Sequence, residues 1–285
     1  MSGVASPSRM YFPISTDPGP GGYDVLTDPD GLAAFCLDVD TERAHYLELK
    51  RQIAAQPGRA PAQAPGAATE PPVRAAEQFV RARMLEHPAF RAQSELLCRQ
   101  TFAELVFALQ EDLVVMHRAA GHAPERARAV HMHVCFPGGW DPAQLLGKSF
   151  TALHARVPYE RGFGRGERTE HAARLFQAPL ARYVWSVCPE PTLDRHPDTP
   201  RQRDFHSATE LFLRVERQIM VPLPEAEPEL GTTSLFFIRT YVYGRDRLSA
   251  AQRGALTEAI TNMSDAMRRY KGMFGYETSI LRLLS

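Results

Sequence analysis

Two segments decide the fold: Leu211–Met220 (LFLRVERQIM) and Ser234–Tyr243 (SLFFIRTYVY). Both are rich in β-branched and aromatic residues, and each has the two-residue period of a β-strand. In the first segment Arg217 falls on an otherwise apolar face, whereas Arg214 and Glu216 fall on the other. We therefore predict two strands, with at least one buried arginine that needs an acidic partner or an anionic ligand.

The second strand has the same feature, because Arg239 shares a face with Phe237 and Tyr241. A structural cation–π contact or salt bridge is one interpretation of this arginine. The other interpretation is a cavity between the strands that holds a carboxylated or otherwise anionic ligand. For Arg214, Glu216 and Gln218, the alternative to a pocket is an ordinary solvent-exposed row.

Working outward, the segments Ala129–Phe136 and Arg182–Cys188 also read as strands. The remaining periodic segments predict helices; they are Asp40–Ala55, Val73–Glu86, Ser94–Ala120, a short helix after Asp141, Arg168–Gln177 and a last helix capped by Ser249. Helices gathered first, strands in the centre and a helix at the end predict an α+β fold with a largely antiparallel sheet.

Four segments read as irregular structure. Residues 1–40 are expected to form an arm over the core, and Gln56–Pro72 (QPGRAPAQAPGAATEPP) to form a surface loop or linker. A Gly-rich loop is expected at Tyr159–Gly166 and a long polar connection at Pro189–Ser207. Long loops inside a compact domain tend to carry function.

The composition excludes several classes of protein. The 285 residues contain 33 Lys+Arg and 33 Asp+Glu, so the broad positive field of a nucleic-acid-binding protein is absent. No stretch approaches 18 apolar residues, and the first residues lack the apolar core of an export signal. We therefore expect a cytoplasmic protein with no nucleic-acid partner and no membrane.

The motifs of common cofactor and catalytic sites are also missing. The sequence has no G-x-G-x-x-G, P-loop or G-x-S-x-G motif. The cysteines lie too far apart for a zinc or iron–sulfur site and are expected to be buried or partly buried thiols; they are Cys36, Cys98, Cys135 and Cys188. His131 and His133 share one strand face and form a weak candidate metal pair. His154 lies in an apolar stretch, where a core histidine is the ordinary interpretation.

Six short motifs, in order, give the chain a resemblance to a known family: Glu111–Met116 (EDLVVM), Val134–Trp140 (VCFPGGW), Leu153–Pro158 (LHARVP), Trp185–Ser186, Leu213–Gln218 (LRVERQ) and Ile238–Tyr241 (IRTY). The sequence resembles the haem-dependent oxidative N-demethylase family, the haem-binding subunit of dimethylamine monooxygenase systems. The resemblance runs from about Phe12 to the last helix.

The resemblance implies a PAS-like antiparallel sheet that encloses haem b, with N-terminal helices and a C-terminal helix. Residues 1–120 would be an arm and helical region packed on the core, and residues 121–285 the haem-binding region. The implied reaction is oxidative N-demethylation, or a related oxygenation, of a small amine with O2. Electrons would come from a partner protein or subunit with flavin and an iron–sulfur cluster, supplied by NAD(P)H.

Site residues follow from the same motifs. His154 matches the histidine of a His-x-x-Val-Pro motif, which implies the axial ligand and so the metal-binding residue. The resemblance further implies that Arg214, Arg217 and Trp140 bind the cofactor. Catalytic roles are implied for three residues of the charged and aromatic strand motifs, which are Glu216, Arg239 and Tyr241.

The chain also departs from the family pattern. Gly138 stands where the family often has Ser, and the Gln218–Pro222 end of the first strand differs as well. The substrate is therefore less defined than the haem scaffold, and a different amine, an N–O or an N–N compound stays open. The alternative function, of another class, is a haem-binding PAS-like sensor or binding protein without turnover.

Overall fold

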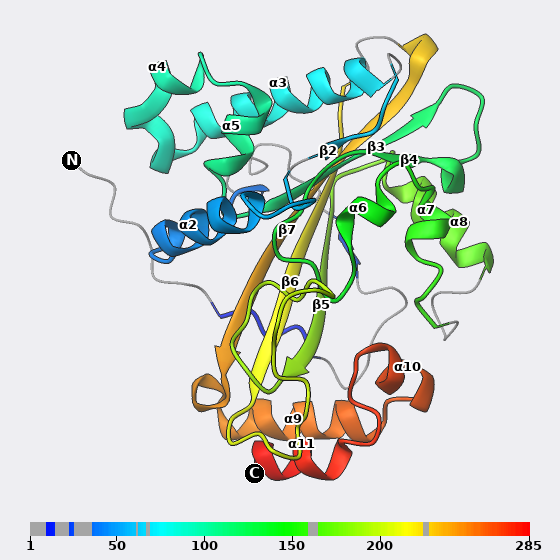
Figure 1. Ribbon diagram of the computed structural model, residues 1–285. Coiled ribbons are helices and arrows are strands. Elements are labelled where there is room, and N and C mark those ends of the chain that lie inside the picture. Colours follow the sequence, from blue (N-terminus) through cyan, green and yellow to red (C-terminus); the bar gives the residue numbers. More distant parts are fainter. Residues whose placement is uncertain are drawn as a thin grey trace.

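The computed structural model describes residues 10–14, 23–25, 36–60, 62–66, 69–158, 165–224 and 228–285 (Figure 1). Within these ranges, seven strands form one sheet in the order β1-β5-β6-β7-β3-β4-β2, and every neighbouring pair is antiparallel. The strands are β1 (Tyr23–Val25), β2 (Ala62–Gln63), β3 (Asp112–Ala119), β4 (Arg128–His133), β5 (Leu180–Cys188), β6 (Phe212–Pro222) and β7 (Gly231–Gly244). The predicted α+β class with an antiparallel sheet is confirmed.

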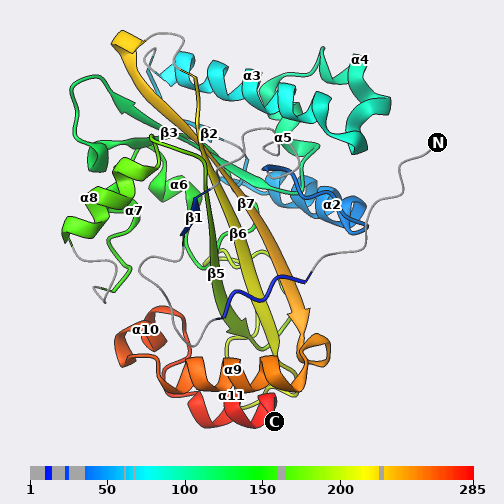
Figure 2. The same ribbon diagram turned by 180° about the vertical axis from the view of Figure 1, so that it is seen from behind.

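The helices gather around the two ends of this sheet. They are α2 (Arg43–Ala54), α3 (Glu70–Glu86), α4 (Ser94–Leu97), α5 (Phe102–Phe107), α6 (Pro142–Leu145), α7 (Phe150–Leu153), α8 (Arg165–Arg174), α9 (Ala250–Thr261), α10 (Asp265–Tyr270) and α11 (Glu277–Leu284). Helices α9 and α11 lie across one end of the long strands β5, β6 and β7, and α3 to α5 lie by the other end (Figures 1 and 2). No described helix is long and apolar enough to cross a membrane.

The register of β6 and β7 assigns the charged residues to two faces. Arg217 lies opposite Arg239, and Val215 lies opposite Tyr241, so these four share what we call the Arg239 face. Glu216 points to the other side of the sheet, which we call the Glu216 face. The neighbours of Glu216 on that face along β6 are Arg214 and Gln218.

Apolar side chains hold helices against both faces. On the Arg239 face, α3 and α5 pack on one part of the sheet, with Val80, Leu105 and Phe237 in one buried cluster. Helices α9 and α11 pack on Val215 and its neighbours farther along the strands. On the Glu216 face, α7 and α8 pack against strand residues such as Met220. Each fully buried Val, Leu or Phe side chain contributes about 1.5–3 kcal/mol.

The prediction of one helix over Ser94–Ala120 is wrong in its second half. That stretch contains α4 and α5 and then β3, which pairs with both β4 and β7. Val114 and Val115 are buried on opposite faces of the sheet. A strand covered on both sides loses its alternation of polar and apolar residues, so its apolar run imitates a buried helix.

Two other segments also differ from the expectation. Gln56–Pro72 is not only a loop, because β2 pairs with the edge of β4 and α3 already begins at Glu70. The predicted last helix, which was to run from Ser249 past Met267, is interrupted and forms α9 and α10, and a further helix, α11, follows it. The Ser264 hydroxyl caps α10 by accepting from the Met267 amide (3.1 Å), and Gly272 has a positive φ of 72° that ends it.

The expected N-terminal arm and Gly-rich loop are described only in part. Within residues 1–40, β1 pairs with β5, and the Tyr11 amide donates to the Tyr243 hydroxyl (3.1 Å). Residues 159–164 of the Gly-rich loop lie outside the described residues. The predicted short helix after Asp141 is α6, and the structure shows that the Asp141 side chain caps it.

Candidate functional site: a cavity on the Glu216 face

A cavity of about 1020 Å³ lies mainly on the Glu216 face of the sheet and extends around β5, because Tyr183 and Trp185, which pair with Arg217 and Val215, also line it. Ligand pockets for small molecules run up to about 1,000 Å³, so this cavity is large enough for a cofactor together with a small substrate. Its apolar part includes side chains of the central strands and of helices α6 and α7, among them Met116, Met132, Met220, Phe236, Ile238, Leu145 and Leu153. Its polar part includes Arg214, Glu216 and Gln218 of β6.

His154 lines this cavity at the end of α7. Ser149 caps the helix at its start, and the ring of His154 packs on Phe150 with 4.2 Å between ring centroids. His154 Nδ1 lies 2.9 Å from the Phe150 carbonyl oxygen. Because a carbonyl oxygen only accepts, Nδ1 carries the proton, and a neutral ring then has its lone pair on Nε2. Metal-binding histidines are commonly oriented by such a bond.

The loop that contains Trp140 forms another part of the wall. Its start is fixed to the sheet, because Phe136 N donates to Asp112 Oδ2 (2.7 Å) and Arg214 Nη2 donates to the Phe136 carbonyl (2.8 Å). A Cβ at Gly138 would lie 3.0 Å from Glu216 Oε1. The departure from the family pattern at position 138 therefore lies directly against the Arg214–Glu216 pair.

Arg214 of this pair is buried and Glu216 is partly buried. Arg214 is 3% exposed, and its Nη1 binds Glu216 Oε1, while Gln218 Nε2 donates to Glu216 Oε2 (2.8 Å). Burial by itself would raise the pKa of Glu216, but the charge and hydrogen bonds of Arg214 hold this pKa below its usual value. Glu216 is therefore ionised at neutral pH, and the alternative of a solvent-exposed row is wrong for Arg214.

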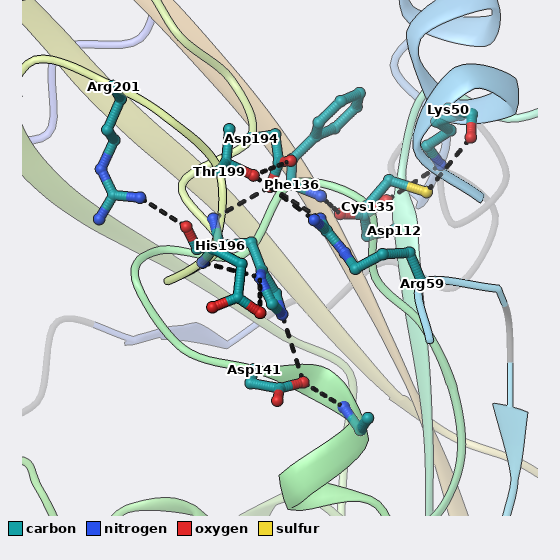
Figure 3. A network of polar contacts seen from close by, with 12 residues as sticks. Lys50, Arg59, Asp112, Cys135, Phe136, Asp141, Asp194, His196, Thr199 and Arg201 are labelled. Carbon is teal, nitrogen blue, oxygen red and sulfur yellow. Dashed lines mark hydrogen bonds and ion pairs between the residues drawn. The ribbon is translucent and has the colours of Figure 1, made fainter. Parts of the chain in front are cut away.

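The long connection over 189–207 supplies further arginines that the sequence did not single out: Arg195, Arg201 and Arg203. Figure 3 shows the network that holds this connection. Asp194 accepts from Arg59 Nη2 (2.9 Å) and from the Thr199 hydroxyl (2.6 Å), and His196 Nε2 lies 3.3 Å from Asp141 Oδ1. In the sequence, only the length of this connection indicated that it could carry functional residues.

Arg217, Arg239 and Tyr241 lie on the Arg239 face and are not among the residues that line the cavity. The prediction of buried arginines is confirmed, since Arg217 is 4% and Arg239 1% exposed. Arg239 Nη2 bonds to Asp40 Oδ2 (3.0 Å), and its guanidinium lies 3.8 Å from the centre of the Tyr46 ring. These contacts support the structural interpretation of Arg239, as a residue that forms a salt bridge and a cation–π contact.

His131 and His133 are also on the Arg239 face, where they pack on Phe102 and Phe107 of α5. His133 forms a buried cluster with Asp112 and Cys135, with ligand-type atoms within 4.8 Å of one another. The ammonium of Lys50 lies 3.2 Å from Asp112 Oδ1 and so supplies the positive charge beside this carboxylate.

Of the cysteines, Cys36, Cys135 and Cys188 are buried, whereas Cys98 is exposed, contrary to the expectation.

Because His131 is buried, we predict that the folded protein loses stability in acid. Burial lowers the pKa of His131 from 6.5 to about 4, so the unfolded chain takes up this proton first as the pH falls. The free energy of unfolding should fall between about pH 6.5 and pH 4, by roughly 3 kcal/mol at 1.4 kcal/mol per pKa unit. Urea unfolding at pH 7 and pH 5 should show a smaller difference for His131→Phe than for the wild type. Exposed His122→Phe is the control, and equal differences for all three proteins would contradict the assignment.

An α+β chain with a large cavity, walled by imidazole, guanidinium and carboxylate groups, has the features of a cofactor-binding protein. Residues 73–281 match the family model described as haem-dependent oxidative N-demethylase, alpha subunit-like, and the chain belongs to that family. The resemblance predicted from the six motifs is thus confirmed. No protein with a curated description matches the chain significantly. The family suggests a haem-dependent oxidoreductase, and an alpha subunit implies a system of several subunits.

Proposed function

We propose that the chain binds haem b in this cavity and removes an N-methyl group oxidatively from a small amine. The observation that carries the proposal is the position of His154 on the cavity wall, with Nδ1–H directed at the Phe150 carbonyl. His154 is the proposed axial ligand through Nε2. In this proposal the strands from β4 onward form a PAS-like haem scaffold, and the described parts of residues 1–120 pack on it and add β1, β2 and β3 to the sheet.

The residues present fit a haem. The methionines and Phe236 offer an apolar surface to the ring, as haem pockets require, and Trp140 adds an aromatic wall. Arg214 Nε is buried without a hydrogen-bond partner among the described residues, so one donor at the cavity wall lacks an acceptor. Haem carboxylates are acceptors of the kind that a guanidinium binds best.

The haem supplies the activation of O2, for which pocket polarity is decisive. In the overall reaction an N-methyl amine, O2, two electrons and two protons give the demethylated amine, formaldehyde and water. The two electrons come from NAD(P)H through an external flavin and iron–sulfur protein. The four cysteines of this chain do not form a cluster site: three are buried singly in different elements and one is exposed.

Glu216 is the proposed catalytic carboxylate of this chain. Ionised Glu216 can hold the ammonium form of the amine, or accept its proton at a carboxylate oxygen, and Arg214 and Gln218 fix its orientation. Arg217, Arg239 and Tyr241 act from the Arg239 face in this proposal. They support β6 and β7 and so position Arg214 and Glu216.

The turnover test measures formaldehyde release from methylated amines. The isolated chain with NADPH should give none, and addition of a flavin and iron–sulfur reductase should start the reaction. Glu216→Gln should lower the rate on the order of 10²-fold, which is the usual contribution of a positioned acid or base. The matched control is Glu258→Gln, an exposed carboxylate that also lines the cavity. An unchanged rate in Glu216→Gln removes this residue from the mechanism, and NADPH-driven turnover by the chain alone refutes the need for a donor.

A further inference from the structure

The charges around the cavity do not balance. Among the described residues, seven Lys and Arg line it, namely Arg156, Arg182, Arg195, Arg201, Arg203, Arg214 and Lys271. Three carboxylates line it, namely Asp141, Glu216 and Glu258. The excess is four positive charges (seven minus three). The two propionates of a haem would neutralise two of these, so a cavity that already holds the cofactor still favours an anionic group.

Two of the three carboxylates already have partners, and the third, Glu258, is exposed on α9. Asp141 accepts from the Ala143 amide (2.9 Å) at the start of α6 and lies against His196. Glu216 is bound by Arg214 and Gln218. Neither of these carboxylates is therefore available to neutralise the arginines of the 189–207 connection.

Arg195 and Arg201 have neutral partners instead. Arg195 Nη1 donates to the Ser186 hydroxyl (3.2 Å), and Arg201 Nη1 donates to the His196 carbonyl (2.6 Å). Neither makes an ion pair with a residue in the described ranges. Arg201 Nε is buried without an acceptor there. Such a donor at a cavity wall fits a ligand that brings acceptor oxygens.

Burial and repulsion between like charges act together on these side chains. Burial lowers the pKa of Arg195, and the nearby positive charge of Arg214 lowers it further. The pKa of Arg201 is lowered by burial and then by Arg203 and Arg195. An anionic group among them would relieve both effects, whereas a substrate with only an ammonium group would add to the repulsion.

From this charge distribution we infer that the amine substrate also carries an acid group, as an N-methylated amino acid does. Its ammonium group lies against Glu216 and its carboxylate lies against Arg195 and Arg201. The inference rests on the proposed function for the identity of the reacting N-methyl group. It assigns Arg195, on a loop outside the six family-like motifs, to substrate specificity.

The test compares N,N-dimethylglycine with its amide, which has nearly the same shape but no acid group. Binding is measured by calorimetry on the protein with and without added haemin, and haem binding is read separately from the absorption spectrum. The wild type should bind the acid at least tenfold more tightly than the amide. Arg195→Gln should remove most of this preference, Arg195→Lys should retain part of it, and the exposed arginine variant Arg51→Gln should retain all of it.

Each result decides the inference. A Soret band with equal binding of acid and amide overturns it and leaves the haem assignment intact. Loss of haem in Arg195→Gln with an unchanged preference assigns Arg195 to a propionate and also overturns it. No Soret band, but an Arg195-dependent preference for the acid, supports the anionic ligand class and refutes the haem function. Neither haem binding nor a preference refutes both.

Discussion

His154→Ala is expected to abolish haem binding, so that the purified variant lacks the Soret band of the wild type. The reason is geometric: among the histidines whose side chains the structure describes, His154 combines a place on the cavity wall with an Nδ1–H fixed by a carbonyl. Loss of an axial imidazole removes the bond between protein and iron. His154→Gly with added free imidazole should recover part of the band.

The control for this variant is His45→Ala, which changes an exposed histidine of α2. Thermal unfolding should be similar for His154→Ala and the wild type without haem, because His154 is only partly buried. A wild-type spectrum in His154→Ala would contradict the assignment. The ligand would then be sought among other histidines, beginning with His131 and His133.

Arg239→Met is expected to lower the free energy of unfolding by about 3–5 kcal/mol. The variant leaves the carboxylate of Asp40, which is 2% exposed, without its cation in the interior. It also removes the cation–π contact with Tyr46. Chemical denaturation of the protein without haem measures this change, because haem binding would itself stabilise the folded state.

Arg51→Met provides the matched control, since Arg51 forms an exposed ion pair with Glu48 and should change stability by less than about 1 kcal/mol. The double variant Arg239→Met/Asp40→Asn should be less destabilised than Arg239→Met alone, because the unpaired charge is gone. A stable Arg239→Met protein that fails to hold haem would contradict the structural role and favour a place for Arg239 at the cofactor.

The sequence predicted the central strands well and β3 poorly, for one physical reason. β6 carries Arg214, Glu216 and Gln218 at alternate positions, so its two-residue period is visible, and the sides of its charged residues and of Arg239 in β7 are correctly predicted. In β3 the residues Leu113 to Met116 are all buried, and nothing in their pattern separates a strand from a helix. Only the pairing of this segment with β4 and β7 shows that it is a strand.

The sequence motifs identified several residues of the site, but they did not show which residues line the same cavity. His154, Trp140, Arg214 and Glu216 come from separate motifs and line one cavity. The resemblance implied site roles for Arg214, Arg217 and Arg239 alike, although the two-residue period already separated Arg217 from Arg214, and the register places Arg217 and Arg239 on the Arg239 face. Which face a helix or loop covers depends on tertiary packing, and so does the contribution of Arg195, which no local pattern indicates.

The central claim is that the cavity on the Glu216 face holds haem. The most direct measurement is a haemin titration of the purified protein, followed by absorption with and without reductant, for the wild type and for Ile238→Trp. Ile238 lines the cavity, so a tryptophan at this position would fill part of its volume with a bulky ring. We predict a Soret band that saturates at one haem per wild-type chain, shifts on reduction and is lost or strongly weakened in Ile238→Trp. A folded wild-type protein that gives no saturable Soret band, or a folded Ile238→Trp variant that binds haem as tightly as the wild type, would contradict the account.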